Sequence, residues 1–194
     1  MKIRNMLLAV IAVTCLAACH PTAPQTAYRR NSGFVFGTNY NLVYRSDSDL
    51  CQAVLDRLAK YDSSLSVYNP HSLLSQLNEG DSVVADSMML RVFLEAKRFH
   101  RVSGGAFDIT VEPLSRLWRF TRDLVDDTIS TEQWQSLVQG LDTVMPLIGL
   151  DKVSIRGNVV RKADRRMKIN ANALAEGFGI DVAAGVLEEH GVTD

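Results

Sequence analysis

The residues best suited to chemistry lie between Ser103 and Phe120, in the sequence S-G-G-A-F-D-I-T-V-E-P-L-S-R-L-W-R-F. The pair Gly104-Gly105 allows positive backbone φ angles or a close approach of the backbone to a ligand. Asp108 follows between two apolar residues, and its carboxylate could accept hydrogen bonds from a bound molecule. The alternative is a surface turn in which Asp108 caps the next segment. Residue chemistry alone leaves both interpretations open, because a Gly-Gly-x-x-Asp pattern is a weak motif.

The N-terminus has the pattern of a secretory signal. Lys2 and Arg4 precede an apolar run over residues 6–18, which is too short to span a bilayer comfortably as a mature helix. The run ends in L-A-A-C, and small residues before a cysteine resemble the processing box of bacterial lipoproteins. We therefore expect residues 1–18 to be removed and Cys19 to carry lipid, which holds a protein on a membrane surface without spanning it. Plain secretion is the alternative.

The rest of the chain divides into a tether and one domain. Residues 19–32 are polar and contain two prolines, which is typical of a flexible linker. Residues 33–194 are enough for a single domain with a hydrophobic core. Cys51 is the one cysteine of that domain, so no disulfide is expected within it. The formal net charge of −1 gives no electrostatic basis for binding nucleic acid.

Hydrophobic periodicity predicts a mixture of strands and helices. Alternation predicts a strand over 34–44 with a bulge at Gly37, a hairpin over 152–163 around Gly157-Asn158, and a further strand over 166–169. Helices are expected over 49–61, over 73–77 with Ser72 as cap, from 87, after Pro113, near 131–134, and from 170–172 to about 190. Because the elements lack regular βαβ alternation, the predicted fold class is α+β.

Three further segments carry short motifs. They are residues 36–38 (F-G-T), residues 65–78 (L-S-V-Y, then S-L-L-S-Q-L-N) and residues 170–178 (N-A-N-A-L-A-E-G-F). Together with 105–120, they resemble in chain order the motifs of the ApbE family, the FAD:protein FMN transferases. The family patterns are Met-Gly-Thr; Ser-x-Tyr followed by Ser-x-x-Ser-x-x-Asn; Gly-Ala-Phe-Asp-x-Thr-x-x-Pro-Leu-x-x-Leu-Trp-x-Phe; and Asp-Leu-x-x-Ile-Ala-(Lys or Glu)-Gly-Tyr.

The resemblance implies a fold, a location and a reaction. The fold would be an ApbE-like α+β domain with a mixed or antiparallel sheet and packed helices, on a lipoprotein anchored to the membrane on the extracytoplasmic, periplasmic side. The reaction would be Mg²⁺-dependent transfer of the FMN moiety of FAD onto a threonine hydroxyl of a target protein, a membrane redox subunit, with release of AMP. In such a phosphoryl transfer the enzyme positions the reactants and the metal neutralises charge.

The resemblance also implies a set of site residues. The backbone carbonyl of Ala173 would bind Mg²⁺. For several of the flavin contacts the residues themselves allow a structural role instead, as core aromatics, a helix cap or an acid in the first turn of a helix. The residues that would bind FAD are Phe36, Tyr68, Ala106, Phe107, Asp108, Asn170 and Glu176.

The chain departs from the family pattern in three places. Phe36 stands where the family has methionine, and Asn170 stands for aspartate, which removes a negative charge. The family continues past residue 194 with a His-x-x-x-Asp-Pro segment and an Asp-x-x-x-Thr that supplies further metal ligands. We therefore expect the domain over 33–194 to be incomplete, with its C-terminal part missing.

The sequence identifies no catalytic base. His71, His100 and His190 each have a better structural explanation, such as a cation near the end of a helix. A non-catalytic FAD-binding lipoprotein is therefore the main alternative to a transferase, and a structural or adhesive surface lipoprotein is a third possibility.

Overall fold

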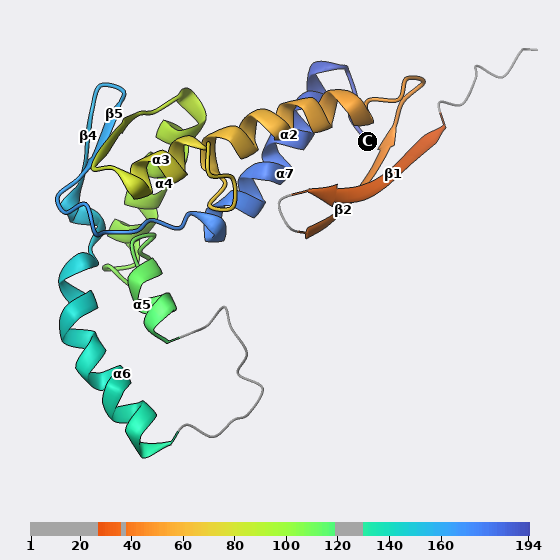
Figure 1. Ribbon diagram of the computed structural model, residues 1–194. Coiled ribbons are helices and arrows are strands. Elements are labelled where there is room, and N and C mark those ends of the chain that lie inside the picture. The colour runs from red at the N-terminus through yellow and green to blue at the C-terminus, as the bar shows by residue number, and fades with distance from the viewer. Residues whose placement is uncertain (1–26, 36–37, 119–129) are drawn as a thin grey trace, which may run out of the picture.

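The structure, a computed structural model, describes residues 27–35, 38–118 and 130–194. These residues form helices and two small antiparallel sheets, in agreement with the predicted α+β class. β1 and β2 make one sheet, and β3, β5 and β4 make the other, in that order. Figure 1 shows the two sheets at opposite ends of the molecule, with α2 and α7 running between them.

The first sheet is a hairpin of β1 (Tyr28–Val35) and β2 (Thr38–Arg45). The prediction of a single strand over 34–44 is wrong, because this sequence belongs to two paired strands; Gly37 lies outside the described residues. The predicted tether over 19–32 is wrong at its end, since residues 28–32 belong to β1. Their backbone groups find partners in β2, which a flexible linker would leave to water.

The alternation of side chains in β2 explains how the hairpin packs. Tyr44 is buried, and Leu42 packs beside it against Leu187 of the last helix. Phe34, in β1, is 70% exposed. In β1 the residue that packs inward is Val35, one position further along, and a shift of one residue moves a side chain to the other face of a strand.

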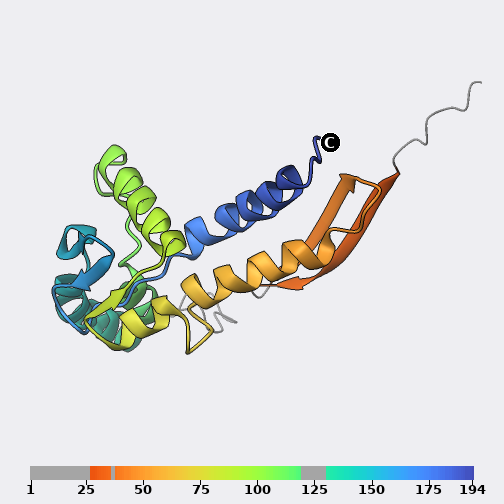
Figure 2. The ribbon, with the colours of Figure 1, turned by 90° about the horizontal axis from the view of Figure 1, so that it is seen from above.

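The predicted helices α2 (Cys51–Leu65) and α7 (Asn172–Glu189) pack against each other. They lie side by side and form the main helical layer (Figures 1 and 2). The contact between them buries Val54, Leu58, Ala183 and Val186, and each Å² of apolar surface removed from water contributes about 25 cal/mol. None of the helices in the described ranges combines the length and the apolar character that crossing a membrane requires.

Capping side chains begin α3 (Leu73–Glu79) and α4 (Ser87–Val102). The Ser72 hydroxyl accepts a hydrogen bond from the Ser75 amide at 2.9 Å, which confirms the predicted cap. The cap of α4 is Asp86, whose carboxylate accepts from the Met89 amide at 2.7 Å. The inward faces of the two helices belong to the larger hydrophobic core, with Leu74, Leu77, Met89, Val92 and Phe93.

The second sheet contains the predicted hairpin of β4 (Val153–Arg156) and β5 (Val159–Lys162). The 3₁₀ turns η1 (Met145–Leu147) and η2 (Leu150–Lys152) lead into it. The sequence does not predict β3 (Ser82–Val84), which pairs with the free edge of β5. The predicted strand over 166–169 is wrong: within the described part of the chain, these residues pair with no strand, because side chains supply the partners of their backbone.

Two helices form an arm that extends away from both sheets (Figure 1): α5 (Glu112–Leu117) and α6 (Thr131–Val144). Both are predicted. Gly140 allows their close contact, because a Cβ at this position would come within 2.5 Å of Leu117 Cδ1. The rings of Trp118 and Trp134 meet edge to face, with centroids 6.0 Å apart.

Lys162 is a buried cation at the end of β5, only 2% exposed. Its ammonium group donates to the backbone carbonyls of Asn78 at 3.2 Å, Arg165 at 3.0 Å and Met167 at 2.7 Å. Burial disfavours the charged form, so the pKa of Lys162 is lowered from 10.5 to about 8, and the nearby charge of Lys168 adds to this effect. The three hydrogen bonds hold the loop after β5 against the end of α3.

The free energy of unfolding should therefore depend on Lys162 above pH 8. Between about pH 8 and 10.5 the unfolded chain binds more protons at Lys162 than the folded protein does, so stability rises with pH in this window. Below about pH 8, Lys162 is charged in the folded protein, so the full free-energy cost of burying its charge is present. Urea unfolding from about pH 7.5 to 9.5 should show the stability difference between wild type and Lys162→Met growing in favour of wild type. Lys60→Met, at an exposed position of α2, is the control, and a constant difference for Lys162→Met would contradict the expectation.

Candidate functional site

Three of the sequence motifs meet where the chain enters α7. The Asn78 side chain accepts from the Ile169 amide at 2.7 Å and donates to the Ile169 carbonyl at 2.8 Å. The next amide, of Asn170, donates to the carbonyl of Ile109 at 2.8 Å. The segment before α7 therefore lies between the end of α3 and the chain that follows Asp108, although these segments are far apart in sequence.

An open cavity of about 600 Å³ lies at the start of α7. Pockets for small molecules and cofactors commonly have volumes of about 300–1,000 Å³. Tyr68 and Glu176, two of the predicted flavin contacts, line it together. The remaining lining residues come from β2, α2, the loop after α2 and α7: Thr38, Tyr61, Asp62, Leu65, Ser66, Asn172 and Ala175.

The predicted flavin contacts in this cavity are exposed. Tyr68 is 75% exposed, and a large aromatic ring at the edge of a cavity offers a flat apolar surface. Glu176 is also exposed, and among the described residues its carboxylate makes no hydrogen bond or ion pair. Among the described residues, neither side chain is held by a hydrogen bond or ion pair to another protein group.

Tyr61, in α2, forms the part of the cavity wall where α2 meets α7. It is 2% exposed, and its hydroxyl donates to the carbonyl of Ala175 at 3.1 Å. Burial raises the pKa of the Tyr61 hydroxyl, which keeps it protonated as a donor. Sequence reasoning missed both Tyr61 and Asp62, because a tyrosine at the end of a helical pattern carries no signal of ligand contact.

The carboxylate of Asp108 is used by the protein itself. One oxygen accepts from the Thr110 amide at 2.7 Å and from the Thr110 hydroxyl at 2.6 Å, and the other accepts from the Leu150 amide at 2.9 Å. The Asp108 side chain is only 8% exposed. Thr110 in turn accepts from the Gly149 amide at 2.8 Å. Asp108 thus ties the glycine loop, which we define as residues 103–108 with Gly104 and Gly105, to the turn before β4.

The glycine loop itself adopts the predicted backbone. Gly104 and Gly105 have φ angles of 62° and 89°, which side-chain-bearing residues rarely adopt. Nδ1 of His100, in the last turn of α4, lies 2.8 Å from the carbonyl oxygen of Phe107, which fits a structural role for His100. Ala106, Phe107 and Asp108 do not line the 600 Å³ cavity; Phe107 packs against the hydrophobic core.

Asn170 stands next to the cavity and not in its lining. Its amide nitrogen donates to Glu112 at 2.8 Å, and its side-chain oxygen accepts from the Asn172 amide at 3.0 Å. Glu112 is held in turn by Arg116 at 2.9 Å. Both ends of the Asn170 side chain therefore contact protein groups. These two hydrogen bonds fix the direction in which the chain enters α7.

The predicted metal ligand, Ala173, lies exposed in the first turn of α7. Mg²⁺ prefers about six oxygen ligands in octahedral geometry. Within the described residues, no three histidine, cysteine, aspartate or glutamate side chains are close enough to hold a metal ion. Ala173 would supply a single backbone oxygen there, so these residues do not form a metal site by themselves. Phe36 and Cys19 lie outside the described residues.

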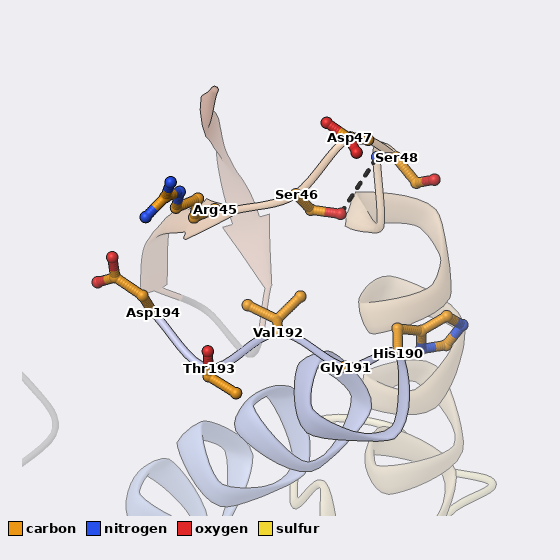
Figure 3. Close-up of a pocket in the computed structure, with 9 residues that line it drawn as sticks. All are labelled: Arg45, Ser46, Asp47, Ser48, His190, Gly191, Val192, Thr193 and Asp194. Carbon is orange, nitrogen blue, oxygen red and sulfur yellow. Dashed lines mark hydrogen bonds between the residues drawn. The ribbon is translucent and has the colours of Figure 1, made fainter. Parts of the chain in front are cut away.

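A second cavity, of about 440 Å³, lies between residues 45–48 and residues 190–194 (Figure 3). The Arg45 amide donates to the Asp194 carbonyl at 2.7 Å, which brings the two segments together. Nδ1 of His190 lies 2.8 Å from the Val186 carbonyl oxygen, in agreement with its predicted structural role. None of the predicted site residues lines this cavity, so the cavity beside α7 is the better candidate.

Replacing Asp108 should destabilise the protein. In Asp108→Asn the side-chain NH₂ would face an N–H or O–H donor, and leaving a buried donor unsatisfied costs about 1–3 kcal/mol. Urea unfolding should therefore show a loss of about 2 kcal/mol. Asp151→Asn, an exposed position in η2, is the control and should change stability by less than about 0.5 kcal/mol. Equal stabilities for the two variants would contradict this role.

Comparison with known proteins identifies the family of the chain. The chain matches the model of the ApbE family over residues 36–194. It is 30% identical over 198 residues to a Vibrio cholerae protein named FAD:protein FMN transferase, in a match that covers 97% of this chain and 57% of the relative.

Solved structures show the same fold. Flavin transferase ApbE from Vibrio cholerae superposes with a TM-score of 0.75 at 27% identity, over 86% of this chain and 55% of that one. The flavinyl transferase ApbE of Pseudomonas stutzeri, in its apo form, superposes with a TM-score of 0.71 at 25% identity, over 86% and 55% of the two chains. The chain thus spans little more than half the length of these relatives. From its sequence match over residues 36–194 and its fold, the chain belongs to the ApbE family.

Proposed function

We propose that the protein transfers the FMN moiety of FAD onto a threonine hydroxyl of a target protein, with release of AMP and with Mg²⁺ as metal. The observation that carries the proposal is the cavity at the start of α7, where Tyr68 and Glu176 come together from distant motifs. The relative from Vibrio cholerae named FAD:protein FMN transferase supports the choice of reaction. The target proposed is a membrane redox subunit that carries the acceptor threonine.

The cavity offers three kinds of contact to a flavin dinucleotide. The exposed ring of Tyr68 can stack on a flat heterocycle. The carboxylate of Glu176 can accept hydrogen bonds from an N–H or hydroxyl group of the ligand. Asn172 lines the cavity as the first residue of α7, and a helix N-terminus attracts anions such as a pyrophosphate.

The glycine loop would contact a part of FAD that lies outside the 600 Å³ cavity, because Ala106, Phe107 and Asp108 do not line it. Asp108 holds this loop to the turn before β4, and the Ile109 carbonyl receives the Asn170 amide just before α7. In the proposal Ala106 and Phe107 contact FAD from this loop, and Asp108 orients them. The carboxylate of Asp108 already accepts hydrogen bonds from Thr110 and Leu150. It would contact FAD only by accepting a further hydrogen bond on a remaining lone pair.

Mg²⁺ would neutralise charge on the phosphates during the transfer. From this part of the chain, the metal would receive only the backbone oxygen of Ala173, in the first turn of α7. One oxygen falls short of the octahedral set that Mg²⁺ prefers, so the other ligands would be groups such as water and the phosphates of FAD.

A transfer assay tests the proposal. The protein is incubated with FAD, Mg²⁺ and an acceptor domain; covalent flavin on threonine by mass spectrometry, together with AMP release, is the expected result, and EDTA should abolish both. Glu176→Gln should weaken FAD binding about tenfold without loss of stability, because the side chain is exposed, and Glu188→Gln, also exposed on α7, is the matched control.

The outcomes separate the alternatives. Tight FAD binding without transfer or AMP release by a full-length version of the protein would contradict the transferase and favour a non-catalytic flavin-binding lipoprotein. Absence of any FAD binding, measured by quenching of flavin fluorescence, would contradict both and favour a structural surface lipoprotein.

We also propose that Cys19 carries lipid and anchors the protein to the extracytoplasmic face of a membrane. The support is the apolar run that ends in L-A-A-C. Cys19→Ser should move the protein from the membrane fraction to the soluble fraction and remove the lipid mass from its N-terminal peptide. An unchanged distribution would contradict the anchor.

A further inference from the structure

We propose that Asn78 is a positioning residue for the cavity beside α7: its side-chain amide holds Ile169 and thereby sets where α7 begins. The inference deepens the proposed function, on which its flavin-binding part rests. Asn78 belongs to the motif over residues 65–78, but unlike Tyr68 of the same motif it does not line the cavity.

The argument begins with the backbone of residues 167–171. Met167, Ile169 and Ala171 are each 0% exposed, yet this segment pairs with no strand in the described part of the chain. A buried backbone group without a partner costs about 1–3 kcal/mol. The carboxamide of Asn78 presents a donor and an acceptor side by side, as the edge of a strand does, and it satisfies both backbone groups of Ile169.

Asn78 can act as a fixed point because its own backbone is held by two cations. The Asn78 carbonyl, near the C-terminus of α3, accepts from Lys168 at 2.7 Å and from Lys162 at 3.2 Å. Cations are favoured at this end of a helix. The neighbouring Leu77 is fully buried in the hydrophobic core, so the backbone beneath the amide has little freedom.

From Ile169 the constraint passes directly into the cavity wall. The next residue, Asn170, accepts from the Asn172 amide at 3.0 Å, and α7 begins at Asn172. A helix is a rigid element, so the position of its first turn determines the positions of Asn172, Ala175 and Glu176, which line the cavity. Figure 1 shows the segment between β5 and α7 joining the second sheet to the helical layer.

Other residue types cannot reproduce the contact at this position. Aspartate keeps the acceptor for the Ile169 amide but loses the donor for its carbonyl. Alanine loses both. Asn78→Asp should therefore fold and show an intermediate effect, whereas Asn78→Ala should show the full effect.

The test compares these variants with Val153→Ala, in the complete chain. Val153 is buried in β4, in the same hydrophobic core as Ile169, so its truncation lowers stability without removing a hydrogen bond of the segment before α7. Hydrogen–deuterium exchange of amides 170–178 should accelerate about tenfold in Asn78→Ala, less in Asn78→Asp, and not in Val153→Ala. The dissociation constant for FAD, measured by flavin fluorescence, should rise about tenfold in Asn78→Ala and stay unchanged in Val153→Ala.

Each result decides a separate question. Exchange that is no faster in the Asn78 variants than in Val153→Ala would overturn the positioning role, whatever the protein binds. Faster exchange with unchanged FAD affinity would overturn the link between Asn78 and the cavity. If wild type bound no FAD, the proposed function would fail, and the exchange measurement would still decide whether Asn78 positions α7.

Discussion

The structure depends on how the buried segment over residues 167–171 satisfies its backbone hydrogen bonds. The segment runs through the hydrophobic core without a neighbouring strand in the described residues, so its partners come from elsewhere. Asn78 pairs with Ile169, the Ile109 carbonyl receives the next amide, and Lys162 donates to Met167. Loss of these bonds would leave polar backbone groups in an apolar environment, which is costly. The path of the chain into α7 follows from this requirement.

The same principle explains why buried polar side chains are found around irregular segments. Asp108 binds the turn before β4 through Leu150, and Lys162 binds three carbonyls of the loop after β5. Burying a charged group is unfavourable, and several hydrogen bonds to the backbone offset that cost. These side chains specify loop geometry, which apolar packing alone determines poorly because it has no direction.

The motif residues therefore separate into two groups with different environments. Asn78, Asp108 and Asn170 direct their polar atoms to protein partners. Tyr68 and Glu176 are exposed and line an open cavity. A binding site needs both groups: exposed residues contact the ligand, and less exposed residues hold the elements from which they project. Recognition of a motif does not by itself say to which group a residue belongs.

The sequence alone determined most of the helices, the hairpin around Gly157-Asn158, the cap at Ser72 and the α+β class, because these follow from local periodicity and from local hydrogen bonds. It also placed Tyr68 and Glu176 in one site through the order of four motifs. It did not predict β3, the division of 34–44 into two strands, or the lack of a strand at 166–169.

Only the tertiary structure decided these points, because strand pairing depends on partners distant in sequence. It also showed that the carboxylate of Asp108, in the glycine-rich segment, is occupied by Thr110 and Leu150. A residue's type shows what it can bind, but the neighbours that the fold brings to it decide what it does bind.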